Sequence, residues 1–259
     1  MALIRCPECG KYISDKAKAC PNCGYPMDDV KPQGDFITDG RVLVKYQGNA
    51  TRVTIPSNIS CIGEHAFMDS NVTHIILPSH VDGMLDWAFA GCRNLRSVVM
   101  SDSIEYIDRY AFIHLDSLEN VTFGKRLRSI RLCAFEKCTA LKSLEMNPYE
   151  INDNAFKGCT ALTDVTILDN YYRYTASIRY DAFNGCVSLR NLTLSSQIHY
   201  IDSGAFSNCT SLSNIRFKGT KEQWRWVTKV SGWHTRVPAT VVHCIDGDID
   251  IDARPLPKK

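Results

Sequence analysis

Apolar residues recur along most of the chain at a spacing of slightly more than twenty positions. An Ala-Phe pair marks each recurrence, and the seven pairs are Ala66-Phe67, Ala88-Phe89, Ala111-Phe112, Ala134-Phe135, Ala155-Phe156, Ala182-Phe183 and Ala205-Phe206. Successive pairs are 22, 23, 23, 21, 27 and 23 residues apart. Periods of about 20 to 50 residues are typical of solenoids, and those of about 20 to 29 of leucine-rich repeats. The pattern therefore predicts a stack of similar coils.

Each repeat carries the same apolar positions around its phenylalanine, and reads I-x-x-x-A-F-x-x-C-x-x-L-x-x-V-x-L. In the third repeat the apolar residues around Phe112 are Ile107, Leu118, Val121 and Phe123. The V-x-L end alternates with a period of two, which predicts a strand. The A-F-x-x-C part is predicted to form a short helical turn. The expected fold is a mixed α/β repeat whose coils bury their apolar sides against one another.

The residues between the two core positions of each predicted strand form one candidate binding surface. They are Ile76, Val99, Thr122, Glu145, Thr166, Thr193 and Arg216. This row is mixed and not strongly charged. We therefore favour a plain solvated sheet face, and keep a binding face as the alternative.

The repeat of 27 residues provides a second candidate surface, because insertions in solenoids form loops that often lie on a binding face. Its extra residues lie near Tyr171, Tyr172, Arg173 and Tyr174. Tyrosine and arginine are enriched at protein interfaces. The alternative is a tyrosine-rich loop that packs onto its own coil. If the loop binds a partner, replacing Tyr171 and Tyr172 with serine is expected to weaken binding while the melting temperature stays unchanged.

A cysteine follows the phenylalanine by three positions in five repeats, at Cys92, Cys138, Cys159, Cys186 and Cys209. The first and third repeats carry Ser70 and Leu115 there. Leucine fills space but cannot bind a metal, so the column is interpreted as small buried thiols rather than as a metal or redox ladder. Disulfides between neighbouring coils are not expected, because the side chains should point in parallel into the core.

Two C-x-x-C pairs near the start of the chain predict a metal site. Cys6 and Cys9 form the first pair, which Gly10 follows directly, and Cys20 and Cys23 form the second, which Gly24 follows. Residues 11–19 between the pairs can return as a short hairpin. Zinc prefers four tetrahedral thiolates, and a closed shell of four cysteines leaves no position for water or substrate. The pattern resembles the zinc-ribbon family and predicts one structural Zn²⁺ ion in residues 1–27, where metal binding drives folding.

Charge disfavours nucleic acid as the main partner. The formal net charge of the 259 residues is +2. Within residues 1–30, four basic residues are balanced by four acidic ones, and four thiolates around zinc add negative charge. A nucleic-acid-binding or regulatory protein with a repeat scaffold stays the alternative, and a salt-dependent shift with DNA or RNA would support it.

The repeats resemble the BspA-like leucine-rich repeats, also called the Treponema pallidum type, over roughly residues 36–247. The seventh unit shows the resemblance well, in Ile201-Asp-Ser-Gly-Ala-Phe-Ser-Asn-Cys-Thr-Ser-Leu-Ser-Asn-Ile215. The resemblance implies a right-handed leucine-rich-repeat solenoid with a cap at each end. The expected organisation is a zinc ribbon at 1–27, a linker at 28–35, a cap hairpin at 36–58, repeats at 59–218, and a C-terminal cap and tail at 219–259.

The expected caps carry their own local signals. Asp39-Gly40 is a two-residue turn signal within the first hairpin. Trp224, Trp226 and Trp233 are expected in the core of the C-terminal cap rather than on a ligand platform. The alternating acids of residues 246–252 fit a strand with one wet face, and they lack the twelve-residue loop of a calcium site.

The sequence predicts a binding protein rather than an enzyme. It contains no nucleophile elbow, phosphate-binding loop, H-E-x-x-H motif or dinucleotide fingerprint. A solenoid with a structural zinc module points to a scaffold for protein–protein interaction. The start of the chain has no secretory signal and no stretch resembles a membrane span, so a cytoplasmic location is expected. The resemblance implies a bacterial protein, although members of that family are commonly surface or secreted proteins.

Overall fold

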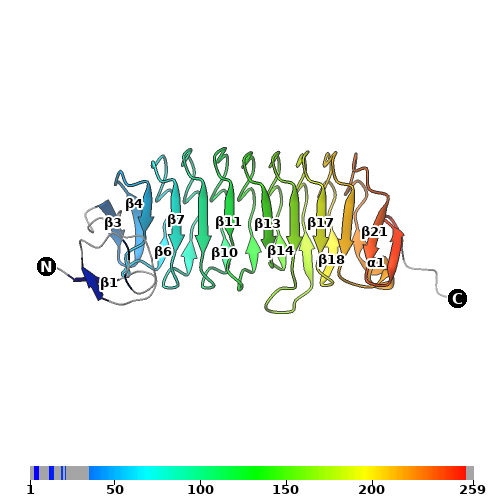
Figure 1. Ribbon diagram of the computed structural model, residues 1–259, viewed down its shortest axis with the longest axis horizontal. Coiled ribbons are helices and arrows are strands. Elements are labelled where there is room, and N and C mark those ends of the chain that lie inside the picture. Colours follow the sequence, from blue (N-terminus) through cyan, green and yellow to red (C-terminus); the bar gives the residue numbers. More distant parts are fainter. Residues whose placement is uncertain (1–2, 6–11, 15–18, 20, 22–34, 255–259) are drawn as a thin grey trace.

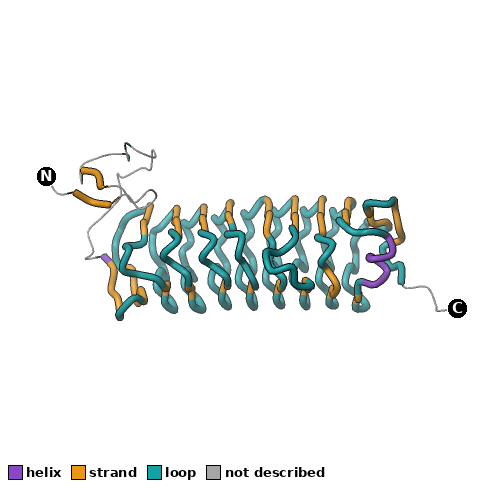
Figure 2. Tube along the Cα trace, turned by 90° about the horizontal axis from the view of Figure 1, so that it is seen from below, coloured by secondary structure: helices purple, strands orange, loops and turns teal. Residues whose placement is uncertain are grey.

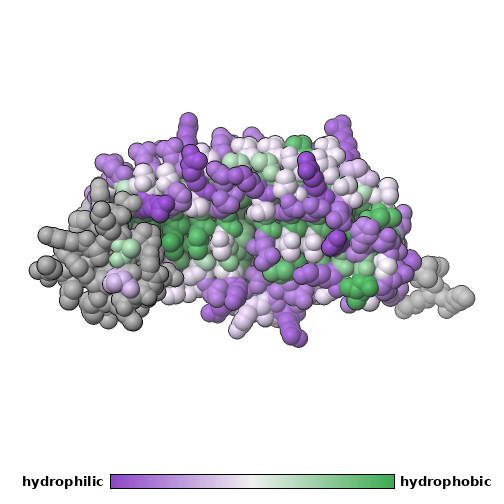
Figure 3. Space-filling model, in the orientation of Figure 1, coloured by the Kyte–Doolittle hydropathy of each residue, from purple (hydrophilic) through white to green (hydrophobic). Residues whose placement is uncertain are grey.

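The computed structural model describes residues 3–5, 12–14, 19, 21 and 35–254. From residue 35 onward the chain forms a right-handed solenoid of about nine coils, which extends along one axis (Figure 1). Two rows of strands run along the solenoid on different faces (Figure 2). Strands of neighbouring coils pair in parallel within each row, and each row is divided once into a four-stranded and a six-stranded sheet. Polar residues border the face seen in Figure 3, with apolar residues gathered between them. The predicted solenoid is confirmed.

The first row, here named the long-strand row, contains the V-x-L ends of the repeats. Val98 and Met100 of the second repeat are buried while Val99 between them is exposed, which confirms the strand prediction. Its strands are β5 (Arg52–Thr54), β7 (His74–Leu77), β9 (Ser97–Met100), β11 (Asn120–Thr122), β13 (Ser143–Met146), β15 (Asp164–Ile167), β17 (Asn191–Leu194), β19 (Asn214–Phe217) and β21 (Val241–Cys244). The outward residues predicted from the sequence pair in register along this row, as Ile76 does with Val99 and Thr193 with Arg216.

The second row, here named the short-strand row, forms around the isoleucine that precedes each Ala-Phe pair. The sequence pattern marked this residue as core but predicted no strand there. The strands are β4 (Val42–Tyr46), β6 (Cys61–Ile62), β8 (Gly83–Met84), β10 (Tyr106–Ile107), β12 (Ser129–Ile130), β14 (Glu150–Ile151), β16 (Ala176–Ile178), β18 (Ile198–Ile201) and β20 (Thr228–Lys229). The coils therefore contribute strands to two sides of the core, and each row consists of two sheets, divided between β8 and β10 and between β11 and β13.

The predicted helical turn at A-F-x-x-C is wrong, because the backbone there is left-handed at two positions of every repeat. The residues two before and two after the phenylalanine all have φ between 53° and 77°, which an α-helix does not permit. Backbone amides of this turn bond to the next coil instead: Tyr110 N–H donates to Leu132 O at 3.0 Å, and Phe112 N–H donates to Ala134 O at 2.8 Å. The turn thus forms a third line of hydrogen bonds between coils.

The seven phenylalanines form a continuous stack through the core. Neighbouring rings lie 4.8–5.2 Å apart between centroids and within 12° of parallel. Tyr46 continues the stack at the N-terminal end, 5.2 Å from Phe67, and Trp233 closes it at the other end with an edge contact to Phe206. Because all seven rings are fully buried, this stack provides much of the apolar contact between coils.

The cysteine column is buried, as the sequence predicted. Each thiol donates to the carbonyl oxygen of a phenylalanine in an earlier coil, for example Cys159 Sγ to Phe135 O at 3.2 Å and Cys209 Sγ to Phe183 O at 3.2 Å. Burial raises the pKa of Cys92 to about 11 and that of Cys159 to about 12. These thiols therefore act as small core side chains that tie neighbouring coils together, and they are poor nucleophiles.

Iodoacetamide at pH 8 is expected to leave the five column thiols of the native protein unmodified. With a pKa of about 12, only roughly one Cys159 thiol in ten thousand is ionised at that pH, and burial blocks access as well. Mass spectrometry of peptides should find Cys61 and Cys244 alkylated, because both are partly exposed. All of these thiols should react in denaturant. Faster alkylation of Cys159 than of Cys244 in the native state would contradict the structure.

An antiparallel strand ends each row at opposite ends of the solenoid. The hairpin of β3 (Phe36–Asp39) and β4 turns at Gly40, whose φ is 57°. At the other end β22 (Gly247–Asp250) pairs with β21, with Ile249 buried and the aspartates on either side exposed, which confirms the wet-faced strand. These hairpins cover edges that would otherwise expose unpaired backbone groups.

The single helix within the described residues, α1 (Lys221–Trp226), packs beneath β22. Thr220 and Gln223 form a capping box at its start. Trp224 and Trp233 are buried in the cap, as predicted, but Trp226 is 61% exposed and its indole N–H donates to Glu222 Oε1. The prediction for Trp226 is therefore wrong, because α1 turns that side chain outward. No helix in the described part is long and apolar enough to cross a membrane.

Candidate functional site

The four predicted zinc ligands, Cys6, Cys9, Cys20 and Cys23, lie outside the described residues. What is described beside them is an antiparallel pair, β1 (Leu3–Arg5) and β2 (Tyr12–Ser14). The segment between the two cysteine pairs thus pairs with the residues that precede the first of them. Among the residues that the structure describes, no group of three or more His, Cys, Asp or Glu side chains could hold a metal ion.

The inserted loop between β15 and β16 does not lie on its own coil but extends back across earlier ones. It forms the long yellow-green loop at the lower edge of Figure 1. The Tyr172 hydroxyl donates to Glu105 Oε1 at 2.7 Å, across 67 residues of sequence. The guanidinium of Arg128 lies 4.3 Å from the centre of the Tyr172 ring. Tyr172 therefore anchors the loop against the short-strand row.

Asn170 fixes the other side of the loop. This residue is buried, and its amide nitrogen donates to Tyr174 O at 2.6 Å and to Gln197 Oε1 at 2.8 Å. The Tyr174 N–H in turn donates to Asn170 Oδ1 at 3.0 Å. These bonds join the two ends of the turn and hold the backbone between them.

The loop presents two tyrosines to solvent, with Tyr171 65% and Tyr174 56% exposed. The Tyr174 ring meets the edge of Tyr149 at 5.6 Å. Tyr149 and Tyr106 help to line a hollow of about 230 Å³ on β10, β12 and β14, together with Arg109, Ser129, Arg131, Leu132, Glu150 and Asn152. We name the surface formed by Tyr106, Tyr149, Tyr171, Tyr172 and Tyr174 the tyrosine face.

Ion pairs between neighbouring coils neutralise most arginines around the tyrosine face. Each joins an acid to an arginine about one repeat away: Asp86 to Arg109 at 3.0 Å, Asp108 to Arg131 at 2.6 Å, Glu150 to Arg179 at 3.0 Å, and Glu105 to both Arg126 and Arg128 at 2.9 Å. Burial raises the pKa of Asp108. Arg173 of the loop is exposed and makes no ion pair with any described residue. The surface is therefore aromatic and nearly charge-balanced.

These ion pairs between neighbouring coils were not predicted from the sequence, although their spacing of about one repeat is visible in it. The described residues also include three histidine–carboxylate pairs, and the longest joins His65 Nε2 to Glu64 Oε1 at 3.6 Å. His243 Nδ1 lies 2.7 Å from Asp248 Oδ1, and His234 Nε2 lies 3.1 Å from Asp252 Oδ1. No hydroxyl or thiol of the described chain hydrogen-bonds to either ring. Neither pair forms a catalytic arrangement of nucleophile and base.

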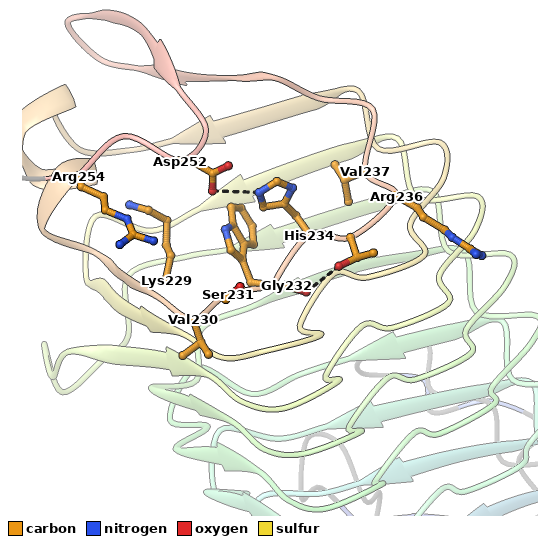
Figure 4. A pocket seen from close by; sticks show the side chains of 11 residues that line it. Lys229, Val230, Ser231, Gly232, His234, Arg236, Val237, Asp252 and Arg254 are labelled. Atoms are coloured by element: carbon orange, nitrogen blue, oxygen red, sulfur yellow. Dashed lines mark hydrogen bonds and ion pairs between the residues drawn. The ribbon is translucent and has the colours of Figure 1, made fainter.

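A second hollow, of about 550 Å³, lies in the C-terminal cap (Figure 4). Lys229, Arg236 and Arg254 contribute basic side chains to its lining, and Asp252 contributes the carboxylate that pairs with His234. The buried Trp233 also lines it. The sequence did not indicate this site, because its residues come from β20, from the following turn and from the segment after β22.

The fold and its surface define a leucine-rich-repeat solenoid. The family model of the BspA type leucine rich repeat region matches residues 44–148 and 143–225, with six copies, and the chain belongs to that family. The family model of the zinc-ribbon domain matches residues 2–27. Nothing in these matches or in the described site indicates catalysis.

The chain is similar to leucine-rich repeat proteins of known structure. A leucine-rich repeat protein of Eubacterium ventriosum is 24% identical, with a TM-score of 0.50 over 81% of this chain and 50% of that one. The T. pallidum leucine rich repeat protein is 22% identical, with a TM-score of 0.40 over 79% of this chain and 82% of that one. A Haemophilus influenzae protein described as uncharacterized is 64% identical over 25 residues, so the chain spans only 33% of it.

Proposed function

We propose that this protein is a non-enzymatic scaffold that binds a protein partner through the tyrosine face. The observation that carries the proposal is the inserted loop, which two sets of hydrogen bonds hold across earlier coils while Tyr171 and Tyr174 stay exposed. Ordered aromatic side chains contribute large contact area at little entropic cost when a partner binds. The unpaired Arg173 adds a residue type that is common at interface hot spots.

The ion pairs favour a protein over nucleic acid as the partner. Nucleic acid binding draws on free cations that neutralise phosphates, whereas the arginines that line the tyrosine face already contact carboxylates. The alternative of a nucleic-acid-binding or regulatory protein predicts salt-dependent binding to DNA or RNA, which the same purified chain can be used to test.

Replacing Tyr171 and Tyr174 with serine is expected to weaken partner binding by roughly thirtyfold or more, since even one hot-spot residue contributes about 2 kcal/mol. The melting temperature should stay unchanged, because both rings are exposed. Tyr172 is no longer suited to this test, because its contacts to Glu105 and Arg128 make it part of the fold. A partner is first recovered from native lysate with the solenoid as bait. Calorimetry then measures its affinity for the unchanged protein and for the double variant.

Tyr180→Ser serves as the matched control, because this tyrosine is 49% exposed but lies outside the tyrosine face. It should bind the partner as the unchanged protein does. Equal loss in the control, or no loss in the double variant, would overturn the proposal. A separate bait that carries the N-terminal ribbon shows whether that module has a partner of its own.

We further propose that Cys6, Cys9, Cys20 and Cys23 hold one structural zinc ion. The match of residues 2–27 to the zinc-ribbon family supports this assignment, as does the donor set, because four thiolates suit tetrahedral zinc and leave no open coordination position.

The location that we propose is the cytoplasm. Eight thiols of the described residues are free, which suits a reducing compartment.

A further inference from the structure

The hollow of the C-terminal cap lies away from the tyrosine face and has chemistry of its own. It is bounded by β20, by residues 230–237 and by the segment that follows β22 (Figure 4). Its volume of about 550 Å³ falls in the range of about 300–1,000 Å³ that is usual for small-molecule sites. The hollow can therefore admit a group larger than a single water molecule or ion.

Trp233 brings an unused hydrogen-bond donor to this hollow. The residue is only 2% exposed, and its indole N–H has no acceptor in the part of the chain that the structure describes. Two other tryptophans of the cap show the usual arrangement: Trp224 donates to Ile251 O at 3.2 Å, and Trp226 donates to Glu222 Oε1 at 2.8 Å. Leaving a buried donor without an acceptor is energetically unfavourable, so an acceptor that enters the hollow is favoured.

The basic side chains that line the hollow lack a carboxylate partner among the described residues. The lining contains three basic side chains, those of Lys229, Arg236 and Arg254. It contains one carboxylate, that of Asp252, which pairs with His234. The Lys229 ammonium donates to the carbonyl oxygens of Trp224 and Val227, at 2.8 and 3.2 Å. None of the three basic side chains makes an ion pair with a described residue. Burial lowers the pKa of Lys229 to about 8, and the nearby Asp252 carboxylate offsets only part of this effect.

We propose that this hollow binds a small oxyanion, either a carboxylate or a phosphate, which accepts a hydrogen bond from the Trp233 indole and pairs with Lys229 and Arg254. An oxyanion supplies the two things that the site lacks, an acceptor for a buried N–H and negative charge beside unpaired cations. The volume of the hollow indicates that the anionic group belongs to a molecule at least the size of an amino acid. The cap would thus carry a ligand site independent of the tyrosine face.

The indole N–H groups allow a direct test by two-dimensional ¹H–¹⁵N NMR on the full chain. Sodium acetate and inorganic phosphate are titrated separately, with sodium chloride at matched ionic strength. The Trp233 indole resonance, assigned with Trp233→Phe, is expected to shift and saturate. The resonances of Trp224 and Trp226 should stay in place, because both already have acceptors. A shift with acetate alone identifies a carboxylate site, and a shift with phosphate alone a phosphate site.

Arg254→Gln is expected to weaken the anion affinity about tenfold, the effect of losing one charge-assisted hydrogen bond. Arg190→Gln removes an exposed charge elsewhere on the solenoid and should leave the affinity unchanged. The proposal fails if neither anion shifts the Trp233 resonance, if sodium chloride shifts it equally, or if both arginine variants weaken binding alike.

Discussion

Phe135→Ala is expected to lower the free energy of unfolding by about 3–5 kcal/mol, as large-to-small changes of buried phenylalanine do. Phe135 lies in the middle of the ring stack, 5.0 Å from Phe112 and 5.1 Å from Phe156, with Phe123 meeting it edge-on at 5.9 Å. Removing the ring leaves a cavity against two neighbouring coils at once. Urea denaturation followed by circular dichroism measures the loss.

The loss should also reduce cooperativity, because the stability of a solenoid is approximately a sum over nearest-neighbour interfaces. Weakening two central interfaces favours unfolding of the two halves in separate steps. Val99→Ala is the control: Val99 is 39% exposed on β9, and its loss should change the free energy by no more than about 0.5 kcal/mol. If Phe135→Ala costs no more than this control, the ring stack does not hold the coils together.

The ring stack also shows how much of the fold the sequence could reveal. The spacing of the Ala-Phe pairs placed every phenylalanine in register, and the alternation of Val98 and Met100 around Val99 correctly predicted the long strands. Both features are local and recur in every repeat, so a departure from the pattern at a single position does not hide it. The short-strand row was missed because a strand of two residues, such as β10, is too short to show any alternation.

The helical turn was wrongly predicted because the spacing of apolar side chains does not report the sign of the backbone angle φ. Both left-handed positions often carry residues that tolerate this conformation, for example Asn154 and Gly158 in the fifth repeat. In the second and third repeats the earlier of these positions holds Trp87 and Tyr110, which lie stacked at 4.3 Å. Bulky residues rarely adopt φ above zero, so these repeats concealed the signal that Gly and Asn give elsewhere.

The candidate site could be predicted only in part. The interval of 27 residues revealed the insertion, and its composition suggested an interface. Where the loop lies depends on Tyr172 reaching Glu105 across 67 residues, and no local pattern encodes a contact of that range. The hollow of the C-terminal cap is harder still, since Lys229, Trp233 and Arg254 come together only through the fold of the cap.

Cys9→Ser is expected to abolish stoichiometric zinc binding. The unchanged chain should carry one zinc ion, released by a strong chelator and by acid, because protons compete for the thiolates. Structural zinc sites contribute about 10–16 kcal/mol of apparent binding free energy to small modules, so residues 1–27 should fold only with the metal. The solenoid should melt at an unchanged temperature, because its core is formed by residues from 43 onward.

Metal analysis of purified protein decides this prediction, with Cys61→Ser as the matched control. Cys61 is a partly exposed thiol at β6 in the solenoid, and its loss should leave one zinc ion per chain. Zinc retained at full stoichiometry in Cys9→Ser would contradict the four-cysteine site, and equal loss in both variants would place the metal elsewhere. If zinc loss also lowered the melting temperature of the solenoid, the ribbon would be coupled to the first coils rather than folding as a separate module.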